Sequence, residues 1–320
     1  MRLAEWIVEQ GIGEARAALI EGGEIVDARI ELGGTIPAGT VLAARLVSIG
    51  QNGRNAVASA GGQEYLLPTA PRGVTQGAAL AIAVTRAAFP GLEPWKRPLA
   101  RASEAAPTAA RSLAERLGAR SLTFPAPRDE HEEAGWSDLI DEARSGIVSF
   151  AGGALRLSPT PAMTLIDVDG ILPIDQLAMA GARAAARAIR RHAIGGSIGI
   201  DLPTVRGKAQ RLVIDALIDA TLTPPFERTG VNGFGFIQIV RPRSGPSLLE
   251  LATDRAGFEA RVLLRRAARS TGATRLVAHP AVIARIGTDW TEALVRQVGG
   301  AVTLRAEPAL AMSGGHAEPA

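Results

Sequence analysis

The sequence of 320 residues contains no cysteine. This absence excludes disulfide bonds, catalysis by a thiolate and any zinc site built on cysteine. No uninterrupted apolar run approaches the roughly 18 residues that a membrane span needs. The opening segment MRLAEWIVEQ also lacks the apolar run of a secretory signal. We therefore expect a cytoplasmic protein with no membrane partner.

Lysine is almost absent as well. Lys96 and Lys208 are the only two in the sequence, and the other basic residues are arginines. Arginine suits bidentate contacts with phosphate, but a biased base composition also replaces lysine with arginine. Because Ala, Gly and Pro are abundant too, composition explains the arginines at least as well as nucleic-acid binding does. The net charge is only +3, so the positions of the basic residues must decide their role.

Hydrophobic residues make up 47% of the chain, which is enough for two or three folded domains. Residues 1–98 form a β-rich region in which Gly22-Gly23 separates two alternating apolar runs, a hairpin signal. Residues 37–90 contain about five short strands separated by turn residues. This pattern favours a small OB-type barrel, and a two-sheet sandwich is the alternative.

The remaining boundaries follow from changes in composition. Residues 99–135 are rich in Ala and Pro and contain an acidic run, which predicts a linker with one helix. Residues 136–250 alternate between strand and helix patterns and predict an α/β core. Residues 251–310 predict a small α+β domain, and residues 311–320 a disordered tail.

Two strands of the predicted core end in aspartate. The run "AMTLIDVDG" ends with Asp167 and Asp169, and "SIGIDLP" ends with Asp201, with one helix between the two strands. A strand, a crossover helix and a second strand imply a parallel pair, whose carboxyl ends lie at one sheet edge. We therefore expect Asp167 and Asp201 to meet at this edge.

Paired carboxylates without nearby His or Cys suit Mg²⁺, which is usually held by one or two carboxylates, waters and a substrate phosphate. Asp169 would point to the same side as Asp167 if the strand continued, and it would support the site. The alternative is that these aspartates cap helices or lie in loops. The sequence leaves both interpretations open.

Basic residues surround these aspartates in sequence. Arg206, Lys208 and Arg211 follow Asp201, while Arg241 and Arg243 end the next strand. If that strand is a neighbour, we expect a phosphate-binding surface beside a metal site, which fits phosphodiester chemistry. The alternative is that each is a solvated charge. The sequence contains no GxSxG, GxxxxGK[ST] or HExxH motif.

Three ordered motifs carry a family resemblance. "TLIDVDG", "GGSIGIDLPTVRGKAQR" and "GFGFIQIVRPRSGPSL" together resemble the catalytic core of the ribonuclease E/G family. The β-rich segment before them looks like that family's OB-type RNA-binding barrel, and "TRLVAHPAVIARI…AVTLRAEP" is similar to its small C-terminal domain. The resemblance implies Mg²⁺-dependent endonucleolytic cleavage of single-stranded RNA that leaves a 5′-phosphate.

The resemblance also implies roles for individual residues. Asp167 and Asp201 match the metal-binding aspartates, with Mn²⁺ as an acceptable substitute for Mg²⁺, and Asp169 stands where the family has asparagine. Lys96 in "PWKR" falls near a lysine that contacts RNA. No zinc is expected because the zinc-linking cysteines are missing, and a homodimer through the C-terminal domain remains open.

Other departures from the family favour a second interpretation. Gly233 replaces an arginine, residues 100–135 replace the region that senses RNA 5′ ends, and Tyr65 is the nearest ring on the expected aromatic platform. These changes suit a non-catalytic RNA-binding protein derived from the same fold. An unrelated metal-dependent phosphohydrolase acting on nucleotides is a further alternative.

Overall fold

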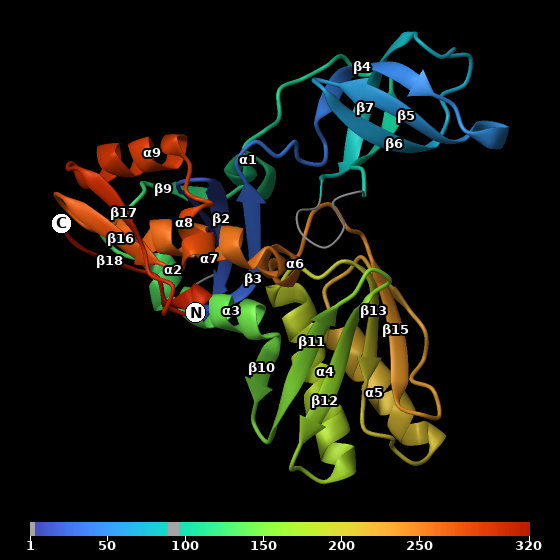
Figure 1. The fold of residues 1–320 in the computed structure, drawn as a ribbon. Coiled ribbons are helices and arrows are strands. Elements are labelled where there is room, and N and C mark those ends of the chain that lie inside the picture. The colour runs from blue at the N-terminus through green and yellow to red at the C-terminus, as the bar shows by residue number, and fades with distance from the viewer. Residues whose placement is uncertain (1–3, 89–95) are drawn as a thin grey trace.

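The described residues of the protein form three β-sheets and one closed β-barrel, connected and covered by helices (Figure 1). The computed structural model describes residues 4–88 and 96–320. The sequence predicts a mixed α/β fold with a small barrel, and both features are present. Within the two described ranges, no helix has the length and apolar character needed to cross a membrane.

The first sheet combines three antiparallel strands with one strand from much later in the chain. In spatial order they are β3 (Glu24–Leu32), β2 (Glu14–Glu21), β1 (Glu5–Gln10) and β9 (Arg120–Leu122), with β9 parallel to β1. The predicted hairpin is confirmed, because Glu21 pairs with Glu24 around Gly22-Gly23. Both glycines have positive φ, 64° and 93°, which is costly for residues with a Cβ.

Helices from distant parts of the chain cover both faces of this sheet. On one face, α3 (Trp136–Ser145), α6 (Leu248–Thr253) and α7 (Arg255–Ala267) enclose a core that contains both Ile7 and Phe258. On the other face, the short helix α1 (Leu113–Leu117) packs against the sheet. The N-terminal strands therefore form a unit of their own with helices that follow much later in the chain.

The barrel is inserted between β3 and α1. Its elements are β4 (Val41–Ser48), the 3-10 helix η1 (Gln51–Gly53), β5 (Arg54–Ala60), β6 (Gln63–Thr69), β7 (Ala79–Arg86) and β8 (Leu99–Ser103). They close in the order β4-β5-β6-β8-β7, which excludes the sandwich alternative. Leu46, Tyr65 and Leu67 fill its interior. Strand β8 lies in the segment predicted as linker, so the barrel extends beyond residue 98.

The prediction of a linker over 99–135 is wrong in a second respect. Besides β8, α1 and β9, this segment contains α2 (Glu130–Glu133), and His131 on α2 is fully buried. Asp129, which caps α2, receives a hydrogen bond of 2.6 Å from Arg265 of α7. The acidic run is therefore ordered by arginines more than a hundred residues away, which its local composition cannot reveal.

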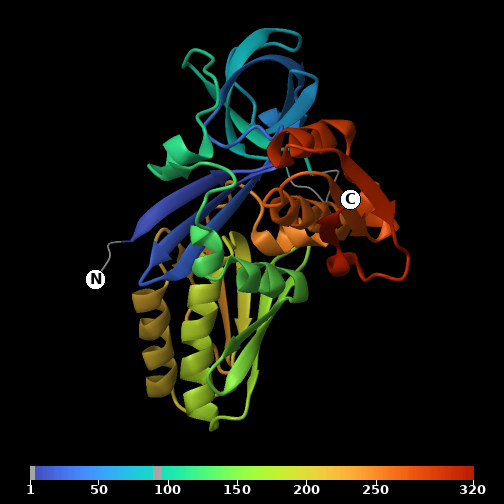
Figure 2. The same cartoon turned by 90° about the vertical axis from the view of Figure 1, so that its left-hand side faces the viewer.

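The α/β core contains a six-stranded sheet covered by two helices on one face (Figure 2). Its strands, in spatial order, are β10 (Ile147–Phe150), β11 (Gly153–Pro159), β12 (Thr164–Gly170), β13 (Gly196–Asp201), β15 (Phe236–Arg241) and β14 (Glu227–Arg228), and its helices are α4 (Ile174–Arg191) and α5 (Lys208–Thr221). The helix α4 lies close to the sheet because Gly181 has no side chain. A Cβ there would lie 2.3 Å from Val168 Cγ1.

The C-terminal unit is a three-stranded sheet packed on α7. Its strands follow the order β17 (Val302–Ala306), β16 (Thr274–Ala278) and β18 (His316–Pro319), with α8 (Pro280–Ile283), α9 (Thr288–Val298) and the 3-10 helix η2 (Met312–Gly314). The prediction of a disordered tail over 311–320 is wrong, because β18 pairs antiparallel with β16. Backbone pairing orders a segment whose sequence shows no strong strand signal.

Candidate functional site

The strand that carries Asp167 and Asp169 alternates cleanly between two environments. Thr164, Ile166 and Val168 are buried, whereas Leu165, Asp167 and Asp169 are exposed. Successive side chains of a strand point to opposite faces, and Ile166 and Val168 share the core built with α4 and α5. Both aspartates therefore lie on the face of the sheet that the two helices leave uncovered, here called the open face.

Asp167 and Asp201 are direct register partners in the parallel pair β12–β13. Neighbouring strands are spaced by about 4.8 Å, and both side chains are exposed on the open face. Neither carboxylate forms a hydrogen bond or ion pair with a residue in the described ranges. The predicted meeting of these two aspartates at one sheet edge is confirmed.

Arg156 is a third charged group at this place. It lies opposite Asp167 in the antiparallel pair β11–β12, and its Nε is 3.8 Å from Asp169 Oδ2. Both side chains of that ion pair are well exposed, 64% for Arg156 and 72% for Asp169. Such an exposed pair contributes little to stability. Arg156 is consequently a cation held beside the carboxylates with its charge accessible to an anion.

Three further cations follow Asp201 along the chain. Arg206 lies in the loop after β13, while Lys208 and Arg211 lie in the first turn of α5. Arg206 and Lys208 are exposed, Arg211 is half-buried, and none of the three pairs with an acid that the structure describes. They remain candidates for phosphate contacts at the edge where β13 ends.

The donor set fits a hard divalent cation with few protein ligands. Within residues 4–88 and 96–320, no group of three or more His, Asp or Glu is arranged to hold a metal ion. Asp169 therefore does not complete a three-carboxylate cluster with Asp167 and Asp201. Two adjacent carboxylates open to solvent still match the usual pattern for Mg²⁺, in which waters and a substrate phosphate supply the other ligands.

The structure separates Arg241 and Arg243 from this edge. Strand β15 is antiparallel to β13, so Phe236 pairs with Asp201 and Arg241 pairs with Gly196. Five residues of strand place Arg241 about 17 Å from the level of Asp201. The expectation that these two arginines surround the carboxylates is wrong, because it assumes that β15 runs in the same direction as β13.

Arg241 and Arg243 instead line a pocket between the core and the first sheet, together with Arg29 and Arg116. Arg241 Nη1 donates to the Ile194 carbonyl at 3.3 Å, and Arg243 forms an ion pair with Glu250. Burial lowers the pKa of Arg241 from its usual value. The first contact lies within the α/β core and the second joins the end of β15 to α6, so both arginines have a structural role.

Lys96 also lies away from the carboxylates. It precedes β8 at the base of the barrel, and Pro94 and Trp95 of its motif lie outside the described residues. Strand β15 ends on the barrel side of the core, where the Ala87 amide donates to the Ser244 carbonyl at 3.0 Å. The carboxylate edge is at the opposite end of the sheet (Figure 1). Tyr65 is only 1% exposed, so it cannot stack on a ligand.

No protein-family model matches the chain, and no curated protein matches it.

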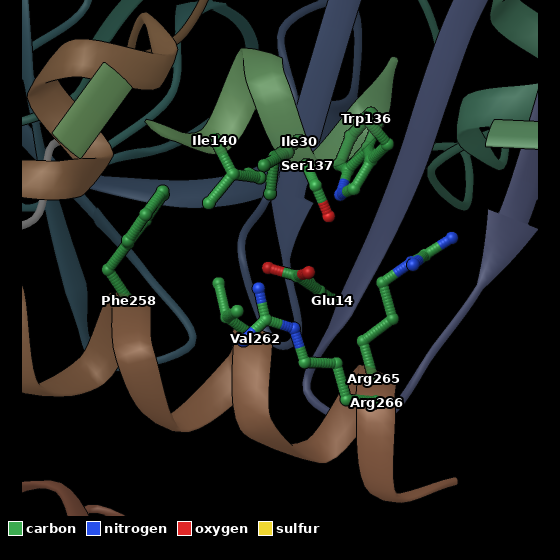
Figure 3. A pocket seen from close by; sticks show the side chains of 9 residues that line it. All are labelled: Glu14, Ile30, Trp136, Ser137, Ile140, Phe258, Val262, Arg265 and Arg266. Atoms are coloured by element: carbon green, nitrogen blue, oxygen red, sulfur yellow. The ribbon is translucent and has the colours of Figure 1, made fainter. Parts of the chain in front are cut away.

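A second polar cluster lies between β2, α3 and α7 (Figure 3). Glu14 and Arg265 line this pocket among apolar side chains such as Phe258 and Val262. Its buried charges pair with one another. The buried Arg16 contacts Glu9 at 2.7 Å and Glu14 at 2.8 Å, and the Arg265 Nε is 3.3 Å from Glu9. These ion pairs hold α7 on the sheet, whereas Arg266, which also lines the pocket, is exposed and forms no ion pair with an acid of the described ranges.

Sequence reasoning missed Arg156. The signal was present in "GALRLSP", where Arg156 stands between the buried residues Leu155 and Leu157. This alternation places Arg156 on the open face, but only the β11–β12 register puts it opposite Asp167.

Proposed function

We propose that the chain is a Mg²⁺-dependent endoribonuclease of ribonuclease E/G type that cleaves single-stranded RNA. The observation that carries this proposal is the register pairing of Asp167 with Asp201 on the open face, with Arg156 opposite Asp167. Two carboxylates and several accessible cations form the arrangement that phosphodiester chemistry needs.

Each group has a role in this mechanism. Asp167 and Asp201 would hold Mg²⁺ or Mn²⁺, and the bound ion supplies Lewis-acid polarisation of a phosphoryl oxygen and a more acidic water. Arg156 would bind the scissile phosphate, and Arg206, Lys208 and Arg211 would bind neighbouring phosphates. Asp169 orients Arg156 through their ion pair. The open face leaves the space that a single strand requires.

We also propose that the barrel is of OB type and binds the same RNA. The return of β8 to a place between β6 and β7 supports this, because it gives the five-stranded Greek-key closure of that fold. Since Tyr65 is buried, its RNA contacts would be polar and not stacking contacts. A homodimer through the C-terminal unit remains part of the proposal.

A fluorescent single-stranded RNA incubated with Mg²⁺ tests this function. Wild type should cleave it, and Asp167→Asn and Asp201→Asn should each lower the rate at least about 100-fold while still binding RNA. Asp289→Asn, on the exposed surface of α9, is the matched control and should cleave normally. Cleavage that persists unchanged in both site variants would refute the metal assignment.

A non-catalytic RNA-binding protein is the second candidate, and the lack of a third acidic ligand among the described residues favours it. The same assay separates the two, because RNA would then bind without cleavage. A parallel titration of Mn²⁺ with wild type and Asp167→Asn shows whether the carboxylates bind metal. Turnover of mononucleotides without oligomer cleavage would identify a nucleotide phosphohydrolase instead.

A further inference from the structure

Phe234 is a large apolar residue whose side chain is almost fully exposed to solvent. It is 83% exposed, although the chain has only seven phenylalanines. Burying a phenylalanine side chain typically stabilises a protein by about 1.5–3 kcal/mol, and Phe234 gains almost none of this. An exposed ring of this kind therefore calls for a role outside the folding of the chain.

The turn that carries Phe234 is held firmly. Asn232 Oδ1 accepts hydrogen bonds from the amides of Phe234 at 2.8 Å and Phe236 at 3.1 Å. Gly235 has φ +90°, and a Cβ there would lie 2.2 Å from the Leu202 carbonyl oxygen. On the other side, the Val231 amide donates to Asp215 at 3.0 Å. The ring is presented by a fixed backbone, so little conformational entropy of the turn is lost when a ligand binds.

This turn lies at the carboxylate edge. Phe236 pairs with Asp201, and the Thr204 hydroxyl donates to the Phe234 carbonyl at 3.0 Å. The segment around Phe234 is thus hydrogen-bonded to the residues that immediately follow Asp201. The barrel, by contrast, lies beyond the other end of the sheet (Figure 1).

A second apolar surface continues from this turn onto the open face. The Phe236 ring lies over Gly199, because a Cβ at Gly199 would be 2.5 Å from Phe236 Cζ and 3.1 Å from Leu165 Cδ2. Leu165 precedes Asp167 by two residues and is 39% exposed. Apolar groups therefore border the carboxylates, and the cations Arg156 and Arg206 lie in the same region.

We propose that Phe234 is a base-stacking residue that binds one nucleobase of the RNA next to the cleaved phosphate. This inference rests on the proposed function. A ligand that has anionic groups for the cations and a flat apolar face for the ring is a nucleotide chain. Stacking on an aromatic side chain binds any base and does not depend on its hydrogen-bonding edge. The site would fix the position of the strand where the barrel cannot reach it.

The test measures RNA binding in EDTA, so that it does not depend on cleavage. Fluorescence anisotropy gives the Kd of the full chain for a single-stranded RNA and for a series with one abasic residue moved along it. The variants are Phe234→Ala and Phe234→Trp. Val240→Ala is the matched control, because Val240 is 49% exposed on the same strand as Phe236 but at the opposite end.

We expect Phe234→Ala to weaken binding about 5- to 150-fold, the loss that corresponds to one stacked base. One abasic position should weaken wild-type binding by a similar factor and have no further effect in Phe234→Ala. Phe234→Trp should bind at least as tightly as wild type, and Val240→Ala should be unchanged.

Three results would overturn the inference, and they differ from one another. If wild type does not bind RNA, the proposed function fails with it. If wild type binds RNA but Phe234→Ala has the same Kd and the same abasic pattern, only the stacking site fails. If Phe234→Ala leaves RNA binding intact and dissociates a dimer by light scattering, the ring belongs to a protein interface.

Discussion

Arg156 lies directly opposite Asp167 across the β11–β12 pair, so a cation and a carboxylate occupy neighbouring positions on the open face. The Arg156 Nε is nevertheless closest to Asp169, at 3.8 Å, and the side chain stays exposed. This end of the sheet therefore combines an accessible guanidinium with the carboxylates of Asp167 and Asp201, which have no ion-pair partner among the described residues. An anion drawn to Arg156 would arrive next to Asp167.

Replacing Arg156 tests this arrangement. Arg156→Ala should weaken the binding of single-stranded RNA by about 10-fold or more, because a hydrogen bond to a charged group contributes roughly 1.5–3 kcal/mol. Arg156→Lys should recover part of the loss, since lysine keeps the charge without the bidentate geometry. Anisotropy measures both. Arg296→Ala on α9 is the control, and an equal loss there would mean that only net charge matters.

Asp169→Asn should have a much smaller effect than Asp167→Asn or Asp201→Asn. Asp169 lies two residues beyond Asp167, about 7 Å along the strand. At this distance in water its charge attracts a divalent ion by about 1 kcal/mol. We expect Mn²⁺ to bind 3- to 10-fold more weakly (an order-of-magnitude figure) and RNA cleavage to persist. Abolished cleavage in Asp169→Asn would make Asp169 a required ligand.

The basic residues near Asp201 should contribute to the salt dependence of RNA binding, whereas Arg243 should not. Substituting Arg206, Lys208 and Arg211 together with alanine should reduce the slope of log K against log salt by up to about 2, because each phosphate contact on a single strand contributes about 0.7. Arg243→Ala should leave this slope unchanged and lower stability by breaking its ion pair with Glu250. A slope that falls in Arg243→Ala would contradict this division.

His131 should make stability depend on pH. Burial, with the charges of Arg265 and Arg16, lowers the pKa of His131 to about 3, and neither ring nitrogen has a hydrogen-bond partner in the described ranges. Unfolding restores a pKa near 6.5, so this stability is present above pH 6.5 and is lost as the pH falls towards 3.

Urea denaturation of wild type and His131→Phe at pH 7.5 and 5.0 measures this effect. The free energy of unfolding of wild type should fall relative to the variant by up to about 2 kcal/mol. His316→Gln is the control, because His316 is exposed. If wild type and His131→Phe lose the same free energy, the buried histidine is not responsible.

Local sequence patterns predicted the elements of the fold whose structure depends mainly on residues close together in the chain. The alternation in "TLIDVDG" identified β12, the Gly22-Gly23 pair identified the hairpin, and the strand–helix–strand order identified the parallel pair. The errors arose where distant segments decide the structure. Asp129 forms a hydrogen bond with Arg265 of α7, His131 packs against Trp136 of α3, and the terminal strand β18 pairs with β16.

The same distinction applies to the candidate site, of which one part was predictable from the sequence and the rest was not. The pairing of Asp167 with Asp201 follows from chain connectivity, because a right-handed crossover leaves little choice. The direction of β15 does not follow from chain connectivity, because the segment between α5 and β15 is long enough for either orientation. Arg241 therefore could not be placed from the sequence, and Arg156 needed the register of an antiparallel neighbour.

The shared core of Ile7 and Phe258 has a consequence for synthesis of the chain. A ribosome releases β1, β2 and β3 long before α6 and α7 exist, so one apolar face of the first sheet lacks these helices during most of translation. The barrel and the α/β core each have hydrophobic clusters of their own and can fold in the meantime. The first strands to emerge would then be among the last to reach their native packing. Their exposed apolar face would be a binding surface for chaperones during synthesis.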